Sequence, residues 1–120
     1  MEMLPDTSAV IDGRVSERVE GGFDGTVYVA EAVVGELEAQ ANDGRESGWD
    51  GLEELQRVAD YADEGLNVEY VGRRPDAVER REAAEGEIDA LIRDLAAEHG
   101  ATLLTSDVVQ IGRASCRERV

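Results

Sequence analysis

The sequence predicts an α/β fold in which a parallel sheet is covered by helices on both faces. Strand-like and helix-like segments alternate along the 120 residues, and strands that are separated by helices join through right-handed crossovers into a parallel sheet. The composition, with 42% hydrophobic and 33% charged residues, is typical of a globular domain. We therefore expect one domain over residues 1–110, followed by a short tail.

The first predicted strand spans residues 3–6, a short apolar segment that contains a proline. Residues 10–19 are interrupted by Gly13, and the glycines within residues 21–25 mark a turn. Residues 26–30, TVYVA, are β-branched and aromatic, as is typical of strands. They form the clearest strand in the first half of the chain.

Two helices are predicted to follow that strand. Residues 31–41 carry one apolar stripe at helical spacing. Residues 42–51 are polar and are predicted to form a loop. Residues 52–62 return to helical spacing, and Gly65 lies where a C-terminal cap is expected.

The second half of the chain repeats this alternation. Residues 66–71 alternate between apolar and polar side chains, which indicates a strand, whereas the charged residues 79–85 fit either a helix or a loop. Residues 88–96 keep the apolar spacing of a helix that ends before Gly100. Residues 101–105, ATLLT, then predict a buried strand.

Charge and cysteine content exclude several classes of protein. The 28 acidic residues outnumber the 12 basic residues and give a net charge of −16, which argues against a generic basic nucleic-acid patch. The single cysteine excludes an internal disulfide and a thiolate zinc cluster. No stretch approaches the roughly 20 apolar residues of a membrane span, and the acidic start is unlike a signal peptide. We therefore expect a cytoplasmic protein.

The last ten residues differ from the rest. Residues 111–120, IGRASCRERV, hold three of the arginines and the only cysteine, Cys116. They match the translation of a common short-read sequencing adapter. We therefore expect the natural reading frame to be interrupted near Gln110, and residues 111–120 to be unstructured and without a role in function.

The acidic body predicts that salt stabilises the fold. Every basic residue is Arg, and residues 1–110 carry 9 Arg and 27 acidic residues, a net charge of −18. This composition resembles that of proteins from salt-accumulating haloarchaea. Because molar salt shortens the Debye length to about 3 Å and screens self-repulsion, we expect the thermal midpoint to rise from low to molar salt. An unchanged or lower midpoint at molar salt would contradict this expectation.

Acidic side chains occupy positions that a parallel sheet brings to one edge. Asp6 ends the first predicted strand, Asp107 follows the last, Asp89 opens the helix before it, and Glu36 lies about one and a half turns into the helix after TVYVA. Ligands of open parallel sheets bind outside the carboxyl ends of the strands. Clustered carboxylates need protons or a cation, and their oxygens suit Mg²⁺ or Mn²⁺.

Each of these acids also has a purely structural interpretation. In that interpretation Asp6 and Asp107 terminate strands and cap turns, and Asp89 favours a helix N-terminus through the helix dipole. Periodicity does not choose between Glu36 and Glu38, because both flank the apolar stripe of their helix. Both interpretations stay open on these residues alone.

Three segments together resemble the PIN domain, a family of metal-dependent nucleases. They are PDTSAVIDGRV at residues 5–15, EAVVGELEAQA at 31–41 and GEIDALIRDLAAEHGATLLTSD at 86–107. The motifs IDGR, GRESGWDGLEEL and VGRRP make the likeness closest to an archaeal branch in which an N-terminal PIN domain precedes an ATPase module and a KH-type segment. The resemblance implies a three-layer α/β/α fold with a parallel central sheet. The helix and final strand that the family has after Asp107 are missing, so we expect a truncated domain.

The resemblance also implies which residues form the site. The catalytic, metal-binding acids would be Asp6, Glu36, Asp89 and Asp107. The hydroxyls that orient these carboxylates would come from Thr7, Ser8, Thr105 and Ser106. Two further candidate acids are Asp12 and Glu87, and the arginines that could meet the substrate backbone are Arg45, Arg73 and Arg74.

The implied activity is hydrolysis of RNA phosphodiesters by water bound to one or two Mg²⁺ or Mn²⁺ ions. KH and ATPase modules in cis, and a second copy of the chain, are the other expected partners. One alternative is a PIN-fold binding or oligomerisation module with an idle site, and another is a phosphate-handling domain, which the absence of Lys disfavours. We expect Glu54 to be a surface acid, silent when changed to Gln.

Overall fold

Four parallel strands form the centre of the fold. The computed structural model describes residues 2–73 and 87–106. The strands lie side by side in the order β3-β2-β1-β4, and each neighbouring pair is parallel. Their bounds are β1 Glu2–Pro5, β2 Thr26–Ala30, β3 Asn67–Val71 and β4 Thr102–Leu104.

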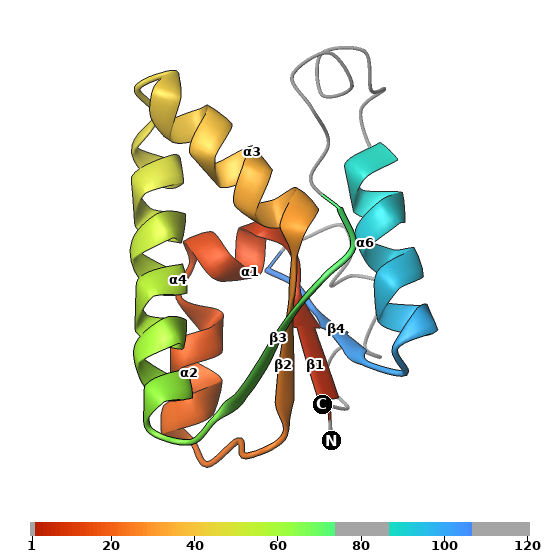
Figure 1. The fold of residues 1–120 in the computed structure, drawn as a ribbon. Helices are drawn as coiled ribbons and strands as arrows, with labels where there is room; N and C mark the ends of the chain where they lie inside the picture. The colour runs from red at the N-terminus through yellow and green to blue at the C-terminus, as the bar shows by residue number, and fades with distance from the viewer. Residues whose placement is uncertain (1, 74–86, 107–120) are drawn as a thin grey trace.

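Helices cover both faces of this sheet. Figure 1 shows α1 to α4 gathered on one side of the strands and α6 on the other. No helix among the described residues is long and apolar enough to cross a membrane. The helices are α1 Thr7–Ile11, α2 Arg14–Glu20, α3 Glu31–Asn42, α4 Glu46–Asp63 and α6 Glu87–Glu98.

The strand order defines where a ligand would bind. From β1 to β2 to β3 the chain moves in one direction across the sheet, and it then returns past β1 to place β4 on the other side. The order therefore reverses between β1 and β4. In doubly wound sheets the binding crevice lies outside the carboxyl ends of the strands at this reversal point.

Apolar side chains of the strands and of the helices form the core. On the face that α6 covers, the rings of Tyr28 and His99 pack with centroids 4.9 Å apart. Burial, followed by the charges of Glu69 and Glu2, raises the pKa of Tyr28 above its ordinary value. The largest fully buried apolar side chains include Met3, Leu4, Val27, Val29, Val33, Leu37, Val58 and Ile92.

Most predicted elements are confirmed, and one is wrong. The strand over residues 26–30 is confirmed residue for residue, and the helix predicted over 31–41 is α3. Residues 42–51 are not a loop, because α4 begins at Glu46. Gly48 and Gly51 account for the error: they lower helix propensity, yet here they allow α4 to approach α3 closely. Residues 79–85 and 111–120 lie outside the described residues.

Gly48→Ala is expected to destabilise the fold by about 3 kcal/mol, because overpacking of a tight contact forces backbone shifts. A Cβ at Gly48 would collide with the backbone of Gln40 and Ala41, which cannot yield as a flexible side chain would. Gly21→Ala is the comparison variant with a milder contact: its Cβ would lie 3.3 Å from the carbonyl oxygen of Glu17, which would have to shift by only a few tenths of an ångström. Equal thermal midpoints for the two variants would contradict the close approach.

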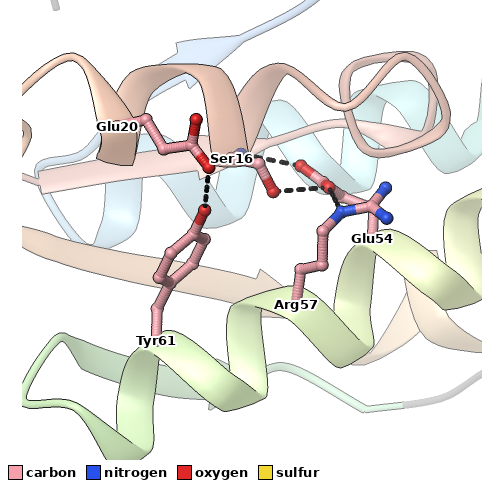
Figure 2. A network of polar contacts seen from close by, with 5 residues as sticks. All are labelled: Ser16, Glu20, Glu54, Arg57 and Tyr61. Atoms are coloured by element: carbon pink, nitrogen blue, oxygen red, sulfur yellow. Dashed lines mark hydrogen bonds and ion pairs between the residues drawn. The ribbon is translucent and has the colours of Figure 1, made fainter.

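Glu54 is buried, so the expectation of a surface acid is wrong. Its side chain is fully inaccessible to solvent and accepts three hydrogen bonds (Figure 2). The Ser16 backbone N–H donates to Oε2 at 2.7 Å, and Oε1 accepts from the Ser16 hydroxyl at 2.7 Å and from Arg57 Nε at 2.9 Å. Because α2 follows Gly13 and has no side-chain cap of its own, Glu54 on α4 satisfies one of its free N–H groups.

Candidate functional site

Asp6 lies at the carboxyl end of β1, beside the end of β4. Its backbone N–H donates to the carbonyl oxygen of Leu104 at 2.9 Å. The side chain is only 4% exposed, and its Oδ1 accepts from the Ser8 hydroxyl at 2.8 Å and from the Ala9 backbone N–H at 2.9 Å. Asp6 therefore caps α1, as its structural interpretation required. Both bonds engage Oδ1, and Oδ2 accepts none from a described residue.

Glu36 reaches the same edge from α3. The Thr7 hydroxyl donates to Glu36 Oε1 at 2.6 Å. Because Thr7 follows Asp6 in the chain, this bond holds the Glu36 carboxylate near the end of β1. Glu36 is half-buried, whereas Glu38 is exposed. The structure thus distinguishes two acids between which helical periodicity does not choose.

Ser8 joins the end of β1 to the end of β4. Its hydroxyl, which donates to Asp6, accepts from the Ser106 backbone N–H at 3.1 Å and lies 3.5 Å from the hydroxyl oxygen of Thr105. Thr105 is buried. These contacts connect the segment that follows β1 with the segment that follows β4. Asp107, which follows Ser106 in the chain, lies outside the described residues.

Arg14 is a basic residue at this edge that the sequence reasoning missed. Its Nε donates to the Ser106 hydroxyl at 3.1 Å, and its Nη1 forms an ion pair with Glu17 at 3.2 Å. The side chain is 46% exposed and so remains accessible to a ligand. Gly13, in a left-handed conformation with φ of 73°, redirects the chain between α1 and α2. In the sequence only the IDGR motif marks Arg14, and that motif does not indicate which distant residue Arg14 contacts.

The other predicted site residues are placed as follows. Asp89 is half-buried in the first turn of α6, and Asp12 is an exposed residue at the end of α1. Arg45 precedes α4 and Arg73 follows β3, both exposed. Glu87 begins α6. Arg74 lies outside the described residues.

The atoms at this edge that could coordinate a metal ion are oxygens, the ligands that Mg²⁺ and Mn²⁺ prefer. Asp6 and Glu36 are both tied to hydroxyls of the segment that joins β1 to α1. Within residues 2–73 and 87–106, no three acidic, histidine or cysteine side chains lie close enough together to hold a metal ion. The described chain thus holds two carboxylates by neighbouring hydroxyls of one segment, Asp6 by Ser8 and Glu36 by Thr7, and their oxygens fit a hard divalent cation.

Most of the chain is similar to known proteins. The family model of the PIN domain matches residues 3–112. Over 115 residues the chain is 49% identical to an uncharacterized KH and PIN-domain containing protein of Methanocaldococcus jannaschii, a match that covers 93% of this chain. The chain spans 18% of the length of that relative. A solved domain of a functionally unknown protein from the same organism is also similar, with a TM-score of 0.86 and 46% identity, covering 97% of this chain and 85% of that one.

Proposed function

This chain belongs to the PIN domain family, and from that premise we propose that it is a metal-dependent ribonuclease. PIN domains are commonly nucleases that use divalent metal ions. One observation carries the proposal: the carboxylates of Asp6 and Glu36, each held by a hydroxyl of the segment that follows β1, lie where the strand order reverses. This is the position at which doubly wound sheets bind ligands.

The carboxylates of Asp6 and Glu36, joined by those of Asp89 and Asp107, would hold Mg²⁺ or Mn²⁺. When bound, such an ion lowers the pKa of its water and stabilises the charge of a phosphodiester transition state. Ser8 fixes Asp6 Oδ1 and Thr7 fixes Glu36 Oε1, so both carboxylates are oriented before a ligand arrives. The chain itself supplies no nucleophile in this proposal.

We propose that Arg14 contacts a phosphate oxygen of the substrate. Its guanidinium is half-exposed and is already anchored at Ser106, beside the proposed metal site. Guanidinium groups form strong, geometrically specific bonds to phosphates. Arg45 and Arg73 are exposed, and they would act further along the nucleic acid.

RNA is the proposed substrate because the curated relative combines KH and PIN domains. A KH segment in cis would bind single-stranded RNA and offset the net charge of −16 of this chain, which repels nucleic acid. An ATPase module in cis belongs to the same proposal. A second candidate function is a binding or oligomerisation module with an idle site, which fits the finding that residues 2–73 and 87–106 bring no three acidic, histidine or cysteine side chains together.

The test is cleavage of a fluorescently labelled single-stranded RNA by the protein with Mn²⁺, with Mg²⁺ and with excess EDTA. We expect cleavage with either ion and none with EDTA. Metal binding without cleavage, measured by calorimetry on the same preparation, would favour the idle module. Cleavage that persists in EDTA would contradict the proposal.

Arg14→Gln is expected to lower kcat/KM for RNA by about tenfold, because a charge-assisted contact to phosphate is lost. The matched control is Arg93→Gln, an exposed arginine on α6. Steady-state kinetics of both variants would measure the difference. Equal kcat/KM values would show that Arg14 does not contact the substrate.

A further inference from the structure

A pocket of about 240 Å³ opens at the end of the molecule opposite to the acidic site. It lies at the amino ends of the strands, since Asp24 and Leu66 line it and come just before β2 and β3. The other walls come from the C-terminal parts of α2 and α4 and from the segment that follows α2. The proposed nuclease site does not use this pocket.

The walls of the pocket combine apolar surface with negative charge. Val19, Phe23 and Leu66 are half-buried side chains that form apolar walls, whereas the acids Asp24 and Glu64 are exposed. None of the lining residues is basic. The 18-residue helix α4 also ends here, and the C-terminus of a helix attracts cations.

The hydroxyl of Tyr61, one of the two aromatic residues that line the pocket, already has a hydrogen-bond partner. Figure 2 shows its side chain reaching from α4 to Glu20 on α2, where the hydroxyl donates to Oε2 at 2.8 Å. This hydrogen bond, followed by burial, raises the pKa of Tyr61 above its ordinary value. The hydroxyl is thus already engaged, and the rings of Tyr61 and Phe23 remain as surfaces for an apolar or cationic group.

We propose that this pocket binds the arginine side chain of a protein segment. The apolar walls suit the aliphatic stem of such a side chain, its planar head stacks on aromatic rings, and the Asp24 and Glu64 carboxylates complement its charge. The volume is below the roughly 300 Å³ at which small-molecule sites begin, so it suits one side chain. Binding here leaves the edge that carries Asp6 accessible.

The test is an NMR titration of the 120-residue chain with the capped peptide acetyl-Gly-Arg-Gly-amide. The reference peptide carries citrulline, the neutral isostere of arginine. We expect a dissociation constant on the order of 1 mM for the arginine peptide, with shifts concentrated at the amides of Phe23, Gly65 and Leu66. The citrulline peptide is expected to bind at least about tenfold more weakly, since it lacks the charge.

Two sets of variants separate this pocket from the general negative charge of the protein. The double variant Asp24→Asn, Glu64→Gln is expected to weaken binding about tenfold, whereas the control Asp50→Asn, Glu53→Gln, which removes two exposed charges of α4 elsewhere, should bind as the unmodified chain does. Equal weakening in both, equal binding of the citrulline peptide, or shifts spread away from the pocket would overturn the proposal. Tighter binding of free agmatine than of the peptide would also overturn it, by assigning the pocket to a small guanidino amine.

Discussion

Asp6→Asn is expected to reduce RNA cleavage and Mn²⁺ affinity by more than about 100-fold. Removing a residue that only supports a metal ligand costs up to about 100-fold, and we expect the loss of a ligand itself to cost more. The amide oxygen of Asn can still accept the hydrogen bonds that Oδ1 of Asp6 receives from Ser8 and Ala9. The cap of α1 and the fold should therefore persist. What the substitution removes is the negative charge beside Glu36.

The matched control for this variant is Asp50→Asn, since Asp50 is exposed on α4. Calorimetry with Mn²⁺ and cleavage assays on both proteins give the comparison, and thermal denaturation without metal verifies that Asp6→Asn folds. A folded Asp6→Asn protein with the Mn²⁺ affinity of the unmodified chain would remove Asp6 from the site.

Glu54→Gln is expected to lower the free energy of unfolding by about 3 kcal/mol, because the ionic contact with Arg57 is lost and an NH2 group replaces one of the two acceptor oxygens. Ser16 and Arg57 together present three donors to the Glu54 carboxylate. A Gln amide nitrogen cannot accept any of them. The corresponding decrease in Tm is on the order of 10–20 °C.

The neighbouring acid provides the control. Glu53 is exposed on the same helix, and Glu53→Gln should change the free energy of unfolding by less than about 0.5 kcal/mol. Urea denaturation of the two variants measures both values. If Glu54→Gln were as stable as Glu53→Gln, the account of Glu54 as the acceptor that holds α2 against α4 would be wrong.

Local patterns were sufficient to predict most strands of the sheet and the place of Asp6 at its carboxyl edge. Thr26 to Ala30 forms β2 because β-branched and aromatic residues favour strands. Asp6 follows β1 directly, so its place at the carboxyl edge follows once the sheet is parallel. The hydroxyls of Thr7 and Ser8 contact the carboxylates of Glu36 and Asp6, although their role in metal binding stays a prediction.

Contacts between distant segments could not be predicted in the same way. Glu54 resembles its exposed neighbour Glu53 in sequence, and two of its three donors belong to Ser16 on α2, a helix that the periodicity around Gly13 did not reveal. Arg14 reaches Ser106 across 92 positions of sequence. Neither contact follows from the spacing of residues within one element, because each depends on how two elements pack.

The most direct test of the proposed metal site is a crystal structure of the chain soaked in Mn²⁺, with the ion located by its anomalous scattering. We expect one or two Mn²⁺ ions outside the carboxyl ends of β1 and β4, with a carboxylate oxygen of Asp6 about 2.0–2.2 Å from an ion, as is usual for a small divalent cation. A structure determined at saturating Mn²⁺ that shows no ion at this edge, with Asp6 bonded only to Ser8 and Ala9, would contradict the proposed metal site.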